Sequence, residues 1–280
     1  MPTSFLQRVI LVISSVLITA TVQAQIEIGL QLYSFRNQIP KDVPGALQKI
    51  SAMGFRYLEG GGTYKLSKEE FKKLLDKNNL KMVSYGAGFE DLEKDPQAVA
   101  EKAAFFGANY VMCSWVPHKG EVFTIDDTKR AVAVFNAAGK IMKEKGLQFV
   151  YHAHGYEFQP YEGGTYFDYM LKHMDPAHAN FQMDVFWFKN SGQDPAAYLL
   201  KYPKRFLTLH LKDRKHGTPN NVTAKADVET NVVLGTGDVN IPAVMEAAKK
   251  IGIKYAFIED ESSRVESQVP KSLAYVNGLK

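Results

Sequence analysis

Short runs of consecutive apolar residues recur along the chain, and a glycine precedes several of them by one to three positions. Such a glycine fits the position just after a helix, where a left-handed backbone ends the helix before a buried strand begins. The sequence therefore predicts a repeated helix, glycine, strand unit. The clearest strands are 57–59 after Gly54, 110–113 after Gly107, 149–152 after Gly146 and 255–259 after Gly252.

Amphipathic windows with helical spacing lie between these strands. In the window 67–78, Ser67 and Glu70 form the pattern of a capping box, and the window 125–145 has apolar residues at helical spacing. Strands that alternate with helices predict parallel pairing with right-handed crossovers. Four further apolar runs bring the number of predicted strands to eight: 28–33, 81–85, 181–184 and 206–211.

Eight such units favour an α/β fold with a single closed (β/α)8 barrel. The alternative is an open, doubly wound sheet, which typically carries a G-x-G-x-x-G turn for a dinucleotide. The run Gly60-Gly61-Gly62 does not fit that turn. Barrels of this kind routinely use about 250 residues as one domain, so we predict a single TIM barrel domain over 25–280.

The first 24 residues resemble a secretory signal. Arg8 precedes an apolar run at 9–18, and Val22-Gln23-Ala24 provides a small-residue cleavage site before Gln25. An uncleaved anchor is the weaker alternative, because the apolar run is short for a membrane span. We therefore expect export, to the periplasm, with no stable membrane insertion.

Composition narrows the function classes. The chain is 45% hydrophobic and 23% charged, as is usual for a globular protein. Removal of Arg8 with the leader leaves 33 basic residues against 30 acidic ones, which does not suggest a nucleic-acid partner. Cys113 is the only cysteine, so no disulfide can form within the chain.

Polar residues gather where the predicted strands end, and in a barrel the carboxyl ends of the strands carry the chemistry. Buried strands that end in carboxylates or imidazoles are costly unless those groups are paired or bind an ion. Carboxylates with imidazole suit one divalent ion such as Mn²⁺, Co²⁺, Mg²⁺ or Zn²⁺. The residues concerned are His152, His154 and Glu157 near one strand, and Asp184, His210 and Glu259 at three others.

Several nearby residues have both a structural and a functional interpretation. Trp115 and Trp187 are either wall aromatics or apolar faces for a sugar ring. Glu59 is either a salt-bridged carboxylate or a substrate contact. We expect Asp213 to orient His210 or Lys212.

Four segments resemble the sugar-phosphate isomerase/epimerase family of xylose-isomerase-like TIM barrels. The likeness runs from about Gly29 to the C-terminus, and Ala153 departs from it where the family has Asn. The segments are Tyr151-His152-Ala153-His154-Gly155-Tyr156-Glu157-Phe158, Met183-Asp184-Val185-Phe186-Trp187 with Gly192-Gln193-Asp194-Pro195, His210-Leu211-Lys212-Asp213, and Leu234-Gly235-Thr236-Gly237-Asp238 with Ile258-Glu259-Asp260-Glu261.

The resemblance implies one divalent metal ion held by four residues, with His152 as the alternative to Glu157 as the ligand from the fifth strand. It also implies that His152 and His154 face the same cavity as the metal ion. We predict that further residues around this cavity contact the substrate. The implied ligands are Glu157, Asp184, His210 and Glu259; the predicted substrate contacts are His152, Lys212, Trp187, Glu59 and Trp115.

The predicted function is a metal-dependent isomerase or epimerase that acts on a sugar or keto-sugar through an enediolate. The candidate catalytic residues for proton transfer are Glu157, Glu259 and His154. The same site would support a dehydratase or lyase that acts on a 3-keto-glycoside or an inosose. Less favoured alternatives are an AP-endonuclease-like phosphodiesterase and a non-catalytic carbohydrate-binding barrel. The expected partner is a small sugar; homo-oligomerisation is left open.

Overall fold

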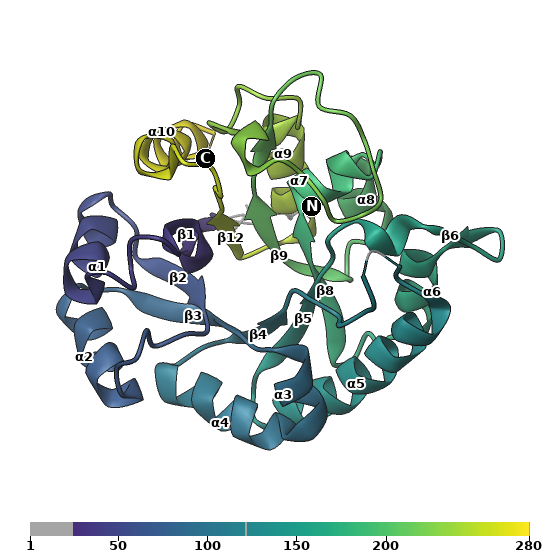
Figure 1. The fold of residues 1–280 in the computed structure, drawn as a ribbon, viewed down its shortest axis with the longest axis horizontal. Coiled ribbons are helices and arrows are strands. Elements are labelled where there is room, and N and C mark those ends of the chain that lie inside the picture. The colour runs from purple at the N-terminus through teal and green to yellow at the C-terminus, as the bar shows by residue number, and fades with distance from the viewer. Residues whose placement is uncertain (1–24, 121, 280) are drawn as a thin grey trace, which may run out of the picture.

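The computed structural model describes residues 25–120 and 122–279, so the predicted signal segment lies outside the described residues. Eight parallel strands form a closed barrel, in which β1 pairs with both β2 and β12 (Figure 1). The predicted (β/α)8 barrel is confirmed. The strands are β1 Glu27–Gln31, β2 Tyr57–Gly60, β3 Lys81–Gly86, β4 Tyr110–Cys113, β5 Gln148–His152, β8 Ala179–Asp184, β9 Phe206–Leu211 and β12 Tyr255–Ile258.

Helices surround the barrel, as Figure 1 shows for the run from α1 to α6. The larger helices are α1 Val43–Ala52, α2 Lys68–Lys77, α4 Pro96–Phe106, α5 Ile125–Glu144, α6 Tyr166–His173, α8 Pro195–Lys201, α9 Ile241–Ile251 and α10 Val265–Asn277. Short elements in the loops are the helices α3 Phe89–Lys94 and α7 Val185–Asn190, the 3-10 helices η1 Leu32–Phe35, η2 Tyr156–Phe158 and η3 Val228–Thr230, and the small strands β6 Pro160–Tyr161, β7 Gly164–Thr165, β10 Asp213–Arg214 and β11 Asn231–Val232.

Local signals in the sequence place the helix ends well. Ser67 caps α2 in the predicted capping box with Glu70, and Gly107 ends α4 with a φ of 75°. The first strand is shorter than the predicted 28–33. It ends at Gln31, whose side chain accepts a hydrogen bond from the amide of Tyr33 and so starts η1. This turn leaves the Tyr33 side chain exposed.

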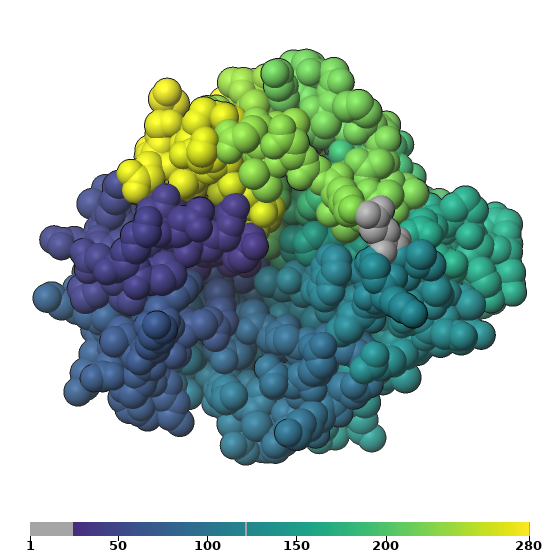
Figure 2. All heavy atoms as spheres, in the orientation of Figure 1, coloured from purple at the N-terminus to yellow at the C-terminus, as the bar shows by residue number. Residues whose placement is uncertain are grey.

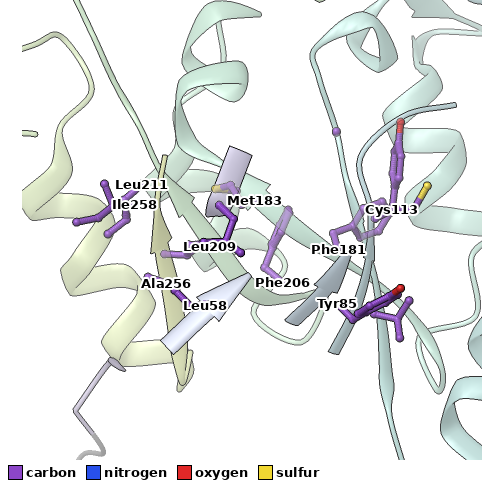
Figure 3. Packing of buried hydrophobic residues seen from close by; sticks show 14 of the residues in the cluster. Leu58, Tyr85, Cys113, Phe181, Met183, Phe206, Leu209, Leu211, Ala256 and Ile258 are labelled. Carbon is purple, nitrogen blue, oxygen red and sulfur yellow. The ribbon is translucent and has the colours of Figure 1, made fainter. Parts of the chain in front are cut away.

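The apolar residues of the strands divide between two faces. Leu209 and Leu211 belong to the main core, where Figure 3 shows them near Ala256 and Ile258. His210, between them in β9, lies on the opposite face, because successive side chains alternate across a strand. A second apolar cluster includes the first residues of β4 and β12; its members are Val83, Tyr110, Met112, Val150, Tyr255 and Phe257.

Among the described helices, none is long and apolar enough to cross a bilayer.

Candidate metal centre

The carboxyl ends of four neighbouring strands bring together a polar cluster. In the strand register, Asp184 of β8 lies beside His210 of β9, and His152 of β5 lies beside Gln182 of β8. Glu259 directly follows β12, which pairs with β9. The barrel therefore joins residues that are more than a hundred positions apart in the chain.

Three buried atoms in this cluster have no hydrogen-bond partner among the described residues: His152 Nε2, Asp184 Oδ2 and His210 Nδ1. Asp184 Oδ2 lies 3.5 Å from His152 Nε2 and 3.8 Å from His210 Nδ1. These three residues offer ligand atoms that all lie within 4.8 Å of one another. Glu259 Oε2 is 3.3 Å from His210 Nδ1 and can join them. Two imidazoles and two carboxylates fit a divalent ion such as Zn²⁺ or Mn²⁺.

The remaining polar atoms of these side chains are held by protein groups. The other ring nitrogen of His210 contacts a carboxylate oxygen of Glu59, and Nδ1 of His152 lies 3.2 Å from Gln182 Oε1. Asp184 Oδ1 accepts hydrogen bonds from the amides of Phe186 and Trp187 at the start of α7. One atom of each residue is thereby left for a ligand, as is typical of metal-binding histidines and carboxylates.

Glu59 lies below the cluster and is fully buried. Its carboxylate accepts hydrogen bonds from Gln31, Ser84 and Gln182 and contacts His210. With all these partners inside the protein, Glu59 orients His210. This buried position does not match the substrate contact that we predicted for Glu59 from the sequence.

Electrostatics distinguish the two histidines of the cluster. Burial lowers the pKa of His152 well below its ordinary value, and the neighbouring His210 adds to this effect. Burial also disfavours the charged form of His210, but Glu59 and Glu259 outweigh it and hold the pKa of His210 well above its usual range.

Lys212 is a buried cation beside the cluster. Its Nζ lies 3.4 Å from Glu259 Oε2 and is also paired with Glu261. Burial would raise the pKa of Glu259, but Lys212 and His210 hold it well below its ordinary value. Lys212 thus keeps Glu259 ionised next to the candidate ligands.

From the sequence we expected Asp213 to orient His210 or Lys212, and the structure shows that it does not. Its carboxylate instead accepts hydrogen bonds from the backbone amides of Gly235, Gly237 and Val239 at 2.8–3.0 Å. These contacts fix the loop that follows β11.

Glu157, the implied strand-5 ligand and a candidate base, lies outside the group of facing ligand atoms. Gly155, with a φ of 99°, turns the chain after β5, and Glu157 then sits in η2. Its carboxylate contacts the Tyr151 hydroxyl and accepts hydrogen bonds from the amides of His154 and Gly155. Burial raises the pKa of Glu157 to about 7, although these hydrogen bonds oppose the rise. The geometry therefore favours His152 as the ligand from β5.

His154 contributes a second imidazole that is not part of the ligand group. Its ring stacks on that of His152, with 4.5 Å between centroids, and lies 5.4 Å from the ring of Trp187. Burial lowers the pKa of His154 to about 4. The residue lines the cavity above the cluster.

The cavity above the cluster has a volume of about 500 Å³, within the usual range for small-molecule sites. Trp115 and Tyr33 line it and are 47% and 53% exposed, so aromatic faces border its mouth. Figure 2 shows the surface hollowed between the purple segment near η1, the yellow C-terminal segment and the green segment after β9. Several of the site residues predicted from the sequence line this cavity: Trp115, His152, His154, Trp187, His210 and Glu259.

Sequence reasoning missed the supporting residues. Gln182 hydrogen-bonds Glu59 at 2.8 Å and Gln31 does so at 2.7 Å, and neither residue was considered. A signal was present, since Gln182 precedes Asp184 by two positions and therefore faces the same side of β8.

Comparison with known proteins agrees with this architecture. The family model of the xylose isomerase-like TIM barrel matches residues 47–278, and the chain belongs to this family. A curated relative, inosose dehydratase from Clostridium beijerinckii, is 27% identical over 188 residues, which is 60% of this chain and 62% of that protein. The matched region thus spans less than two thirds of that relative's length.

Solved structures extend the likeness over nearly the whole chain. A sugar phosphate isomerase/epimerase from Parabacteroides distasonis superimposes with a TM-score of 0.76 and 26% identity, covering 90% of this chain and 98% of that one. The IolI protein with a bound zinc atom superimposes with a TM-score of 0.70 at 12% identity, covering 91% and 98%. The second likeness shows the shared fold alone.

Proposed function

We propose that this protein is a metal-dependent enzyme that isomerises or epimerises a sugar or cyclic keto-polyol by removing a proton next to a carbonyl group. The observation that carries the proposal is the set of three unpartnered buried atoms on His152, Asp184 and His210. Buried polar atoms without partners are costly, and their convergence at strand ends marks a functional site.

His152, Asp184, His210 and Glu259 would hold the metal ion. When bound, a divalent ion supplies positive charge that stabilises the negative charge developing on a substrate oxygen. Glu59 and Gln182 hold the two imidazoles in the orientation that this binding requires.

Proton transfer is assigned to His154 and Glu259. Both line the cavity, and they follow β5 and β12, which are separated in the barrel by β8 and β9. They therefore approach a substrate from different parts of the barrel wall. One group removes a proton from the substrate, and a group then returns a proton. Return to the neighbouring carbon gives an isomer, and return to the opposite face of the same carbon gives an epimer.

A β-elimination is the second candidate function. It is supported by the inosose dehydratase relative and by the neutral imidazole of His154 in the wall of the cavity. The neutral imidazole of His154 would remove the proton next to the carbonyl group, and the imidazolium so formed would give this proton to the departing hydroxyl group, which leaves as water.

One experiment tests both candidates. The protein is loaded in turn with Mn²⁺, Co²⁺, Mg²⁺ and Zn²⁺ and incubated in D2O with a panel of ketoses, keto-sugars and inososes, and the products are followed by NMR. An isomer or epimer that carries solvent deuterium supports the first candidate, and a dehydrated or cleaved product supports the second. Absence of both deuterium exchange and product across the panel would overturn the proposal.

We also propose that the protein is exported to the periplasm, on the strength of Arg8, the apolar run at 9–18 and the cleavage pattern before Gln25. Mass spectrometry of protein from its native host should find the N-terminus at or near Gln25. An intact Met1 in a cytoplasmic fraction would contradict this.

A further inference from the structure

A second hollow of about 560 Å³ adjoins the cavity above the metal cluster. The two share Trp187, Ala224 and Glu261 in their linings, so they meet along a common border. The far wall of the second hollow, here called the side chamber, is formed by residues 224–228 and Asn231. None of the four candidate ligands lines the side chamber.

The walls of the side chamber combine aromatic faces with polar groups. Phe186 and Trp187 line it, and the Nζ of Lys212 lies 5.3 Å and 5.6 Å from their ring centroids. The indole Nε1 of Trp187 is buried and has no hydrogen-bond partner among the described residues. An apolar face beside a few polar groups is suited to bind the ring of a sugar or a similar polyol.

Charge in the side chamber is balanced. Its lining contains two cations, Lys212 and Lys225, and two carboxylates, Asp227 and Glu261. Lys212 is already paired with Glu261 and also approaches Glu259. A phosphate would need a surplus of positive charge, whereas an uncharged ring would not.

The far wall is held in place by its own contacts. Asp227 accepts a hydrogen bond from the amide of Glu229 and so caps η3, and Glu229 is paired with Arg264 at the start of α10. Asn231, the neighbouring residue in the wall, accepts a hydrogen bond of 2.9 Å from the amide of Glu261. The side chamber is therefore part of the folded structure and needs no rearrangement to exist.

We propose that the side chamber binds a second, uncharged ring that is linked to the reacting ring, so that the substrate class is a glycoside of disaccharide size. This inference rests on the proposed function only in placing the reacting ring above His152, Asp184 and His210. The second ring would contact Trp187 and the wall at 224–228.

The test is calorimetric titration of the metal-loaded protein with ligands of graded size: glucose, glucose 6-phosphate, and glucose disaccharides of different linkage. We expect at least one disaccharide to bind about tenfold or more tightly than glucose. Ala226→Trp, which fills the side chamber, should reduce that preference to about one. Trp187→Phe removes the indole N–H and one of the two fused rings of the aromatic face, and should reduce the preference by about three- to tenfold.

Ala177→Trp is the matched control, since Ala177 is exposed and precedes β8 at the amino end of the barrel. It should retain the full preference for the disaccharide. Equal affinity for glucose and every disaccharide would overturn the inference, as would a preference that Ala226→Trp leaves intact. Tighter binding of glucose 6-phosphate than of any disaccharide would assign the chamber to phosphate and would also overturn it.

These binding results are independent of turnover. Deuterium exchange without a disaccharide preference would leave the proposed function standing and overturn the side chamber's role. A disaccharide preference without deuterium exchange on any keto-sugar would support the side chamber's role and overturn the proposed function.

Discussion

The interior of the barrel has two ends that are built from the same strands but differ in chemistry. Towards the amino ends, Val150 of β5 and Tyr255 of β12 belong to an apolar cluster. His152 lies two positions after Val150, Glu259 lies four positions after Tyr255, and both belong to the polar cluster. Because every second residue of a strand faces the same side, a shift of two or four positions moves from one environment to the other.

The difference shows how the barrel separates stability from chemistry. In the apolar cluster, the ring of Tyr255 packs against those of Tyr57 and Tyr110 at 5.4 Å and 6.1 Å between centroids. In the polar cluster, three atoms are buried without partners. Unpartnered buried atoms destabilise a fold, and the apolar cluster at the other end of the barrel helps to offset that cost.

Replacement of Asp184 should have the largest effect on the polar end. Asp184→Ala and Asp184→Asn should both abolish metal retention and turnover, because each removes the anionic donor at the centre of the cluster. Asp184→Asn keeps an oxygen to cap α7, so Asp184→Ala should additionally lose about 1 kcal/mol of stability. Elemental analysis together with urea unfolding measures both effects. Retention of stoichiometric metal by either variant would contradict the proposed ligand set.

His154→Ala should retain the metal ion and reduce turnover by about 10²–10⁴-fold if His154 transfers a proton. Metal content and rate are measured on the same sample. Loss of the metal would make His154 a ligand, and an unchanged rate would make its role structural.

Tyr110→Ala removes a ring of the apolar cluster at the amino end of β4 and should lower the free energy of unfolding by about 3–5 kcal/mol. The folded variant should still bind the metal, so added Zn²⁺ should raise its unfolding midpoint as it does for the unmodified protein. Asp184→Asn should show the opposite pattern, with little loss in the metal-free protein and no rise with Zn²⁺. If the unfolding midpoint of Tyr110→Ala did not rise with Zn²⁺, the two ends of the barrel would not be separable.

Glu59→Gln should weaken metal affinity by about 10–100-fold, because Glu59 holds the ring of His210 from below. Competition with a chelator measures the change. Glu70→Gln serves as the control, since Glu70 lies in the exposed capping box of α2 and should leave the affinity unchanged. An unchanged affinity in Glu59→Gln would show that His210 needs no such support.

Glu157→Gln should have the smallest effect, seen in the pH dependence of stability. Burial raises the pKa of Glu157 from 4.5 to about 7, so between these values the folded protein holds a proton that the unfolded chain releases. Its contribution to stability is therefore full below pH 4.5 and is lost as the pH rises through about 7. Gln cannot titrate, so the stability of the unmodified protein relative to Glu157→Gln should fall between pH 5 and pH 7.5 in urea unfolding. Parallel pH profiles for the two proteins would contradict this role.

Much of the fold could be predicted because its signals are local. Capping at Ser67 and the left-handed glycine at Gly107 act within one or two turns of chain, and both lie where the sequence predicts them. The first strand was predicted to end two residues too late, because the Gln31 side chain starts a 3-10 turn through a contact that apolar patterning does not show.

The site was predicted in outline, and the geometry favours His152 as the candidate ligand from β5. Sequence alone determined that polar residues end the strands, and hence that Asp184, His210 and Glu259 lie near one another. Only the tertiary structure favours His152 over Glu157, because the turn at Gly155 directs Glu157 toward Tyr151 and the backbone amides. Likewise, the position of Glu59 beneath His210 depends on the closure of the barrel, which joins residues 151 positions apart. A residue's type and its position in a strand are local properties, whereas the partner of a buried charge depends on which distant strands meet.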